Sequence, residues 1–247
     1  MIDLKHKTIL VTGASSGIGR ATAILCDKMG AGLILTGRNK NELLKTQSQL
    51  KNKSEIIVAD LSIEKEIENV ISQLPNIDGM AHCAGIIKPM PVKFLRSKHI
   101  DEIFDINFSS AVLLCSHLLT AKKLNTGASV VFVSSVSSHH PYTGGALYSA
   151  SKAALEAFCK SFALENAGKK IRANIVSPAL VKTNLLEEAA KSYLPEELEN
   201  VKQKYPLGLG EPDDVANAIV FFLSPACKWV TGSNLLMDGG LLLNGIK

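Results

Sequence analysis

A tyrosine and a lysine stand four residues apart in ALYSASKAALEAFCKSFALENAG, residues 146–168. In a helix this spacing places the side chains of Tyr148 and Lys152 on one face. An ammonium group beside a phenol stabilises the phenolate and lowers a pKa that is ordinarily ~10, as acid/base chemistry at neutral pH requires. Alone, such a pair is more often a solvated helix face. Ser135 adds a hydroxyl thirteen residues earlier, at the end of the apolar run VVFV, and favours a catalytic interpretation.

A glycine-rich turn follows the first apolar run in ILVTGASSGIGRATA, residues 9–23. The stretch from Gly13 to Gly17 fits G-x-S-x-G, the nucleophile elbow of a hydrolase, with Ser15 as nucleophile. Gly13, Gly17 and Gly19 also form a spaced set that brings backbone against a dinucleotide pyrophosphate. Gly19 has no role in an elbow, and an elbow strand is rarely the first of its chain. We therefore favour dinucleotide binding, with a ligand-free turn as the alternative.

Seven short β-branched runs alternate with longer helix-patterned segments. They lie at residues 8–11, 33–35, 56–58, 79–81, 130–133, 173–176 and 235–237. This alternation is typical of a parallel sheet with crossover helices, and no Pro/Ser-rich linker interrupts it. We predict one α/β domain over residues 1–247, a doubly wound, Rossmann-like parallel sheet of about seven strands with helices on both faces.

The motifs TGASSGIG, ADLS, CAG, Asn107, SS, YSASK, SPALVKT and MDGG together resemble the short-chain dehydrogenase/reductase family, in particular its 3-oxoacyl-(acyl-carrier-protein) reductase-like members. The resemblance covers nearly all of the chain. It implies an enzyme that transfers a hydride between a nicotinamide and a carbonyl or secondary alcohol. In the reducing direction Tyr148 would donate the proton, Ser135 would hold the carbonyl oxygen, Lys152 would bind ribose hydroxyls and lower the tyrosine pKa, and Asn107 would kink its helix and complete a water relay.

The same resemblance implies a set of cofactor contacts at the glycine turn and at the later strand ends. They are Gly13, Ser15, Ser16, Gly17, Ile18, Gly19, Arg38, Asp60, Leu61, Cys83, Ala84, Gly85, Tyr148, Lys152, Pro178 and Thr183. We expect NADP rather than NAD. An NAD-specific fold usually has an acid after its second strand, where this chain has Gly37-Arg38. Arg38 can pair with a 2′-phosphate, and the sequence suggests no carboxylate opposing it.

Three positions depart from the family pattern. Cys83 replaces an asparagine, which puts a hydrogen bond between strands in doubt, and Ala179 replaces a glycine near the nicotinamide. Ala128 stands where carrier-protein-specific members have a basic residue, although Arg172 and Lys170 keep that substrate open. A 3-ketoacyl thioester is therefore one candidate. Another small or apolar ketone of steroid, sugar or polyol type, or non-catalytic nucleotide binding, is the alternative.

Residues 183–206 form an amphipathic stretch in the family's substrate-lid region, with Leu185, Leu186, Tyr193 and Leu194 available to cover an apolar substrate. A helix packed on its own domain is an equally good interpretation. The helix after Tyr148 is apolar around its circumference, and residues 111–119 are similar, which predicts a homo-oligomer, a tetramer or a dimer.

The composition excludes several other classes of protein. The net charge of +4 is modest and its basic residues are scattered, so we expect no nucleic acid partner. Five widely spaced cysteines without C-x-x-C, and histidines without ligand spacing, predict reduced thiols and no metal. We find no signal peptide and no apolar stretch approaching the roughly 20 residues of a membrane span, which predicts a cytoplasmic protein without membrane contact.

Overall fold

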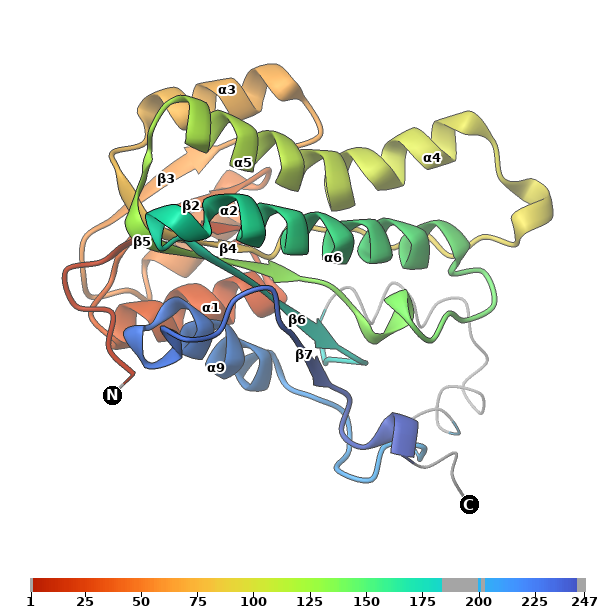
Figure 1. The fold of residues 1–247 in the computed structure, drawn as a ribbon. Coiled ribbons are helices and arrows are strands. Elements are labelled where there is room, and N and C mark those ends of the chain that lie inside the picture. The colour runs from red at the N-terminus through yellow and green to blue at the C-terminus, as the bar shows by residue number, and fades with distance from the viewer. Residues whose placement is uncertain (1, 184–199, 201–202, 244–247) are drawn as a thin grey trace.

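The computed structural model describes residues 2–183, 200 and 203–243, and shows a seven-stranded parallel sheet between two layers of helices (Figure 1). The strands follow the order β3-β2-β1-β4-β5-β6-β7. Their bounds are β1 Thr8–Thr12, β2 Gly32–Gly37, β3 Ser54–Val58, β4 Ile77–His82, β5 Leu124–Val133, β6 Arg172–Pro178 and β7 Asn234–Met237. The predicted α/β fold is confirmed, and each of the seven apolar runs lies in one of these strands.

Two groups of helices cover the two faces of the sheet. Helices α1 (Gly17–Lys28), α2 (Lys40–Gln47) and α9 (Pro212–Leu223) contribute to one apolar core. Helices α3 (Glu64–Gln73), α5 (Ser110–Thr120) and α6 (Ala146–Asn166) contribute to the other core. Because both faces are covered, the central strands read as continuous apolar runs instead of alternating patterns.

The strand order reverses between β1 and β4, and this reversal locates the ligand crevice. Strand β1 pairs with β2 on one side and with β4 on the other, so Thr12 lies beside both Thr36 and His82. Crossovers from these strands leave in opposite directions along the sheet, which opens a gap above their carboxyl ends. The glycine turn of residues 13–17 lies at this gap.

One helical run departs from the expectation that no segment could span a membrane. Residues Ser97–Thr120, comprising α4 (Ser97–Phe104), a π-helical turn (Asp105–Ser109) and α5, are long and apolar enough by length and composition alone. However, Leu114, Cys115 and Leu118 of α5 are fully buried in the core beside the sheet. This packing is that of a core helix in a globular domain.

Candidate active site

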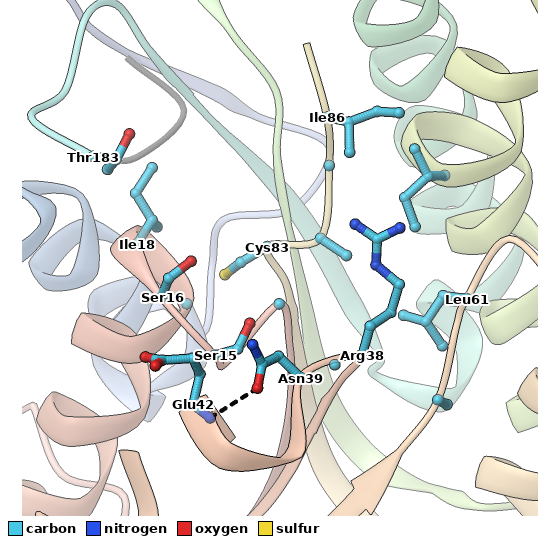
Figure 2. Close-up of a pocket in the computed structure, with 18 residues that line it drawn as sticks. Ser15, Ser16, Ile18, Arg38, Asn39, Glu42, Leu61, Cys83, Ile86 and Thr183 are labelled. Carbon is cyan, nitrogen blue, oxygen red and sulfur yellow. Dashed lines mark hydrogen bonds between the residues drawn. The ribbon is translucent and has the colours of Figure 1, made fainter. Parts of the chain in front are cut away.

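A cavity of about 510 Å³ opens at the carboxyl ends of β1, β2 and β4 (Figure 2). Most of the predicted cofactor residues line it, namely Gly13, Ser15, Ser16, Gly17, Ile18, Gly19, Arg38, Leu61, Cys83, Ala84, Gly85 and Thr183. Asp60, Tyr148, Lys152 and Pro178 are not among the lining residues. The cavity is also lined by Asn39, Glu42, Ala59, Ile86 and Ile106, none of which was among the predicted contacts.

The glycines of the turn allow its backbone to lie close to the neighbouring chain segments. Gly13 has φ +63°, and a Cβ built there would lie 2.9 Å from the Ala84 nitrogen. A Cβ at Gly19 would lie 2.2 Å from the Gly13 carbonyl oxygen, so only glycine lets α1 start this close to the turn. The amides of the first turn of α1 are thus available to an anionic group, and the residues present fit a dinucleotide pyrophosphate.

Ser15 lies in this turn without the partner that a nucleophile would need. Its carbonyl oxygen accepts a hydrogen bond from Arg20, which also pairs with Glu42 at 2.6 Å and so fastens the turn to α2. No histidine is among the described residues that line the cavity, and His139 instead pairs with Glu156. The arrangement favours the dinucleotide interpretation over the hydrolase elbow.

Arg38 follows β2 and is 65% exposed at the cavity edge. The expectation that no carboxylate opposes it is wrong, because its Nη1 lies 3.8 Å from Oδ2 of Asp60. Strands β2 and β3 are parallel neighbours, so the residues that follow them meet at the same edge. Burial raises the pKa of Asp60, but hydrogen bonds from Ser62 and the Arg38 charge hold it below its ordinary value, so Asp60 is an anion at neutral pH.

Cys83 lines the cavity, and its backbone amide takes part in the link between β4 and β1. The Thr12 hydroxyl accepts from the backbone amides of Cys83 and Ala84, both at 3.1 Å, so β1 and the end of β4 stay joined despite the loss of asparagine. Thr12 also lies 3.1 Å from Nδ1 of His82, a fully buried ring. Burial raises the pKa of the Cys83 thiol to about 12 and lowers that of His82 to about 3, so both are neutral.

Tyr148 and Ser135 come together at the ends of α6 and β5. Both are buried, at 9% and 7% exposure, and the Ser135 hydroxyl lies near enough to the phenol to act on its pKa, while its own hydrogen bonds are to the Ser137 amide at 3.1 Å and the Ser137 hydroxyl at 3.2 Å. Burial raises the pKa of Tyr148 to about 12, and the Ser135 hydroxyl opposes this rise. The expected lowering of the phenol pKa by Lys152 is therefore wrong for this structure, because desolvation of the phenolate exceeds the stabilising interactions. Tyr148 holds its proton at neutral pH.

Lys152 lies on the same face of α6, with Nζ 5.8 Å from the centre of the Tyr148 ring. Its ammonium donates to the Val133 carbonyl at 2.8 Å. Burial lowers its pKa to about 8, although Cys83 and the Glu156 carboxylate raise it. A Cβ built on Gly85 would lie 3.3 Å from Lys152 Nζ, so this ammonium lies against a residue that lines the cavity.

Asn107 links the turn between α4 and α5 to the segment after β4 by hydrogen bonds. It lies in the π-helical turn Asp105–Ser109, the widened turn that matches the predicted kink. Its Oδ1 accepts from the Ile86 amide at 2.8 Å, and its Nδ2 donates to the Ile86 carbonyl at 3.0 Å and to Ser151 Oγ at 3.1 Å. The same Oδ1 would lie 3.2 Å from a Cβ built on Gly85, and Lys152 Nζ would lie 3.3 Å from it.

The remaining predicted positions are Pro178, Ala179, Arg172 and the lid segment. Pro178 is buried at the end of β6, and the Ala179 amide donates to the Met237 carbonyl at 2.9 Å. Arg172, which kept a carrier-protein substrate open, donates to the carbonyls of Phe222 and Ser224 and so holds α9. Of the predicted lid, residues 183–206, the structure describes 183, 200 and 203–206, and Leu185, Leu186, Tyr193 and Leu194 lie outside the described residues.

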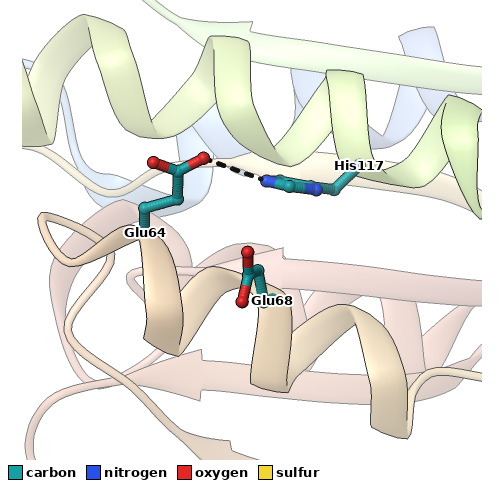
Figure 3. A group of neighbouring side chains, drawn as sticks. All are labelled: Glu64, Glu68 and His117. Carbon is teal, nitrogen blue, oxygen red and sulfur yellow. Dashed lines mark ion pairs between the residues drawn. The ribbon is translucent and has the colours of Figure 1, made fainter.

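One group of possible metal ligands lies elsewhere, between α3 and α5 (Figure 3). Glu64, Glu68 and His117 bring one ligand atom each to within 4.8 Å of one another, and Glu64 pairs with His117 at 3.6 Å. Both glutamates are exposed. Because both carboxylates are open to solvent, this cluster alone gives no reason to place a metal there, and we assign none.

Comparisons with known proteins agree with this geometry. The family model described as enoyl-(acyl carrier protein) reductase matches residues 13–242. A 3-oxoacyl-(acyl-carrier-protein) reductase of Rickettsia felis is 33% identical, with 98% of this chain and all of that protein covered. A tropinone reductase homolog of Arabidopsis thaliana is 31% identical, with 99% and 96% covered.

A solved structure shows the same fold. The short-chain dehydrogenase/reductase of Brucella melitensis, described as glucose/ribitol dehydrogenase, superposes with a TM-score of 0.89 at 29% identity, covering 97% of this chain and 98% of that one. The predicted resemblance is confirmed over the whole chain, and this protein is an alcohol/ketone oxidoreductase that belongs to the short-chain dehydrogenase/reductase family.

Proposed function

We propose that this protein is an NADP(H)-dependent reductase that uses Tyr148 as general acid, with Ser135, Lys152 and Asn107 in supporting roles. The observation that carries the proposal is the meeting of a buried phenol, hydroxyl and ammonium beside the glycine-lined cavity. A nicotinamide bound there supplies the hydride, and the glycine turn and Thr183 are the residues that would hold its dinucleotide.

The protein's own groups account for the proton. A substrate carbonyl oxygen accepts a hydrogen bond from Ser135 and receives the proton of the Tyr148 phenol. The Lys152 ammonium stabilises the resulting phenolate and is placed to bind ribose hydroxyls. Asn107, held to Ile86 by two hydrogen bonds, keeps the neighbouring helix and Gly85 in place beside this ammonium.

The preference for NADP rests on Arg38. Its side chain is exposed at the cavity edge, and its partner Asp60 is 3.8 Å away, beyond the 2.7–2.9 Å typical of a strong charge-assisted hydrogen bond. A 2′-phosphate offers a bidentate partner of higher charge, which favours exchange of the carboxylate for the phosphate. Asp60 is then free to contact the adenine side of the cavity.

A 3-ketoacyl thioester is the substrate that we favour, because five Rickettsia relatives at 32–34% identity carry the name 3-oxoacyl-(acyl-carrier-protein) reductase. The alternative is another apolar ketone, which the tropinone reductase homolog at similar identity and coverage favours. Non-catalytic nucleotide binding is the last alternative, and the intact proton-transfer groups argue against it.

A substrate panel distinguishes these functions. The protein is incubated with NADPH or NADH and, in turn, with 3-ketoacyl thioesters of coenzyme A, the same thioesters on acyl carrier protein, and cyclic and sugar ketones. Loss of reduced nicotinamide absorbance is followed in each case. We expect the largest kcat/KM with NADPH and a 3-ketoacyl thioester. Cofactor binding without turnover of any ketone would contradict an enzymatic role.

We also infer a tetramer in the cytoplasm. All five cysteines are free, which fits a reducing compartment. On α6, Ala153 and Ala157 are exposed and Leu164 is 80% exposed, while β7 at the sheet edge leaves Leu235 and Leu236 at 40% and 45%. Two separate apolar surfaces, each able to pair with its own copy, generate a tetramer of closed symmetry.

A further inference from the structure

A buried carboxylate lies one helical turn beyond Lys152. Glu156 is 4% exposed and follows Tyr148 and Lys152 along α6 at the same four-residue spacing. All three side chains therefore share the face of the helix that meets the sheet. A buried charge is costly unless it is paired and hydrogen-bonded, so its partners indicate what it holds.

Glu156 accepts hydrogen bonds from two strand ends at once. Its Oε1 accepts from Ser134 Oγ at 2.7 Å, Ser138 Oγ at 2.6 Å and Ser177 Oγ at 3.2 Å. Its Oε2 lies 2.8 Å from Nε2 of His139, whose side chain is 62% exposed. Ser134, Ser138 and His139 belong to the segment after β5, whereas Ser177 is the last residue but one of β6.

The segment after β5 also carries Ser135. Its backbone is extended, with φ −161° and ψ 152°, so the side chains of Ser134 and Ser135 point to opposite sides. Ser134 donates to the Glu156 carboxylate, whereas Ser135 lies on the Tyr148 side of the segment, where its hydroxyl accepts from the Ser137 amide at 3.1 Å and donates to Ser137 Oγ at 3.2 Å. The Ser138 amide donates to the Ser135 carbonyl at 3.1 Å and closes a turn. Glu156 is hydrogen-bonded to this turn through the Ser138 hydroxyl.

We propose that Glu156 is a positioning residue, whose carboxylate fastens residues 134–139 and the end of β6 to α6 and thereby fixes the Ser135 hydroxyl against Tyr148. This inference rests on the proposed function, because that function gives Ser135 the carbonyl oxygen. A displacement of about 1 Å at such a group can cost ~10²-fold in rate, so fastening of this kind affects turnover directly.

The carboxylate also acts on the site through its charge. Burial raises the pKa of Glu156, but hydrogen bonds from Ser138, Ser134 and His139 bring it below its ordinary value, so it is an anion at neutral pH. The titratable groups that face it are His139, Lys152 and Cys159. Those that face Lys152 are Tyr148, Cys83, His82 and Glu156. Cys83 and Glu156 both raise the Lys152 pKa, but at neutral pH the thiols and the Tyr148 phenol keep their protons and His82 is uncharged, so Glu156 is the group among them that carries a negative charge.

Two substitutions at this position separate hydrogen bonding from charge. Glu156→Gln keeps an acceptor oxygen but removes the charge, and Glu156→Ala removes both. We expect kcat to fall about tenfold for the first and about a hundredfold for the second, while the Kd for NADPH, measured by its fluorescence, changes less than about twofold. In Glu156→Gln the basic limb of the pH profile moves to lower pH, because Lys152 loses its neighbouring anion. Glu165→Gln, the same change at an exposed position of α6, is the matched control and leaves both quantities unchanged.

A milder variant tests the fastening without removing the carboxylate. Ser138→Ala deletes one donor, and in a double-mutant cycle with Glu156→Gln its effect on kcat is less than additive, because both changes break the same contact. Amide hydrogen exchange of residues 134–139 accelerates in Glu156→Ala relative to wild type, a readout that needs no substrate.

The outcomes separate this inference from the proposed function. A wild type that turns over no ketone contradicts the proposed function, yet faster exchange at residues 134–139 in Glu156→Ala still supports the fastening. Unchanged exchange, or additive effects of Ser138→Ala and Glu156→Gln on kcat, would overturn the positioning role. A fall in kcat that only follows a smaller folded fraction, with an unshifted pH profile, would overturn it as well.

Discussion

At the scale of single residues, the phenol of Tyr148 is the group on which turnover depends most. Tyr148→Phe keeps the ring in its buried place and removes only the oxygen that donates the proton. General acid catalysis contributes roughly 10² to 10⁴ in rate, so kcat should fall by that factor while the Kd for NADPH stays nearly constant. Retention of most of the wild-type turnover of a confirmed ketone would exclude Tyr148 as the acid.

The pKa of Lys152 leads to a prediction for the pH dependence of ketone reduction. Its pKa is lowered to about 8, so the ammonium is present below pH 8 and is lost as the pH rises through that value. Tyr148, with a pKa raised to about 12, keeps its proton across this range. We expect kcat/KM for ketone reduction to be level below pH 8 and to fall above it. A profile that rises between pH 7 and 9 would contradict this assignment.

The charge of Arg38 leads to a prediction for the preference between NADPH and NADH. Arg38→Asp removes the partner of the 2′-phosphate and places a second carboxylate beside Asp60, so kcat/KM for NADPH should fall at least about tenfold relative to NADH. Lys40→Asp, an equal change of charge two residues away on exposed surface, serves as the control. An equal effect of both variants would indicate general charge and not pairing at Arg38.

At this scale, sequence patterns indicated which residues form the site, but not their pKa values or their contacts. Tyr148, Lys152 and Ser135 are indicated by their spacing and Asn107 by the family resemblance, and the structure brings these four residues near one another. The pKa of Tyr148 and the Arg38–Asp60 contact could not be predicted, because desolvation and contacts between neighbouring strands depend on the whole fold.

At the scale of elements, the first turn of α1 depends on Gly19. Gly19→Ala puts a Cβ 2.2 Å from the Gly13 carbonyl oxygen, so the helix must move away from the turn. We expect a lower Tm and, because the amides of the turn shift, at least about a tenfold weaker Kd for NADPH. Gly168→Ala, where a Cβ would meet nothing within 4 Å, is the control. Normal NADPH affinity in Gly19→Ala would show that α1 does not need this close approach.

Strands could be predicted where an apolar run extends over most of the strand. Seven such runs located seven strands. The central strands are apolar because both of their faces are covered, whereas the edge strand β7 is apolar although Leu235 and Leu236 stay 40% and 45% exposed. Strand β5 begins at Leu124, six residues before its predicted start, and Thr126 and Gly127 near its beginning are exposed and carry no apolar pattern. Its pairing with β4 is irregular at this end, which no local pattern indicates.

At the scale of the whole molecule, the two apolar surfaces predict how copies of the chain assemble. The α6 surface carries Ala153, Ala157 and Leu164, and it lies on the helical layer beside α5, whereas Leu235 and Leu236 lie on the edge strand β7 (Figure 1). Each surface can pair with the same surface of another copy. One such contact gives a dimer, and both together give a tetramer.

Ala157→Arg tests this assembly by placing a charge in the α6 surface alone. The substituted position is exposed within one chain, so its effect on folding should stay within about 0.5 kcal/mol. Burial of an unpaired charge between two copies is costly, so light scattering should give twice the chain mass of 26.5 kDa where the wild type gives four times that mass. Ser72→Arg, on the exposed side of α3, is the control and should remain tetrameric. A wild type that scatters as a monomer at micromolar concentration would exclude the tetramer. A tetramer that survives Ala157→Arg would place the contact elsewhere than on α6.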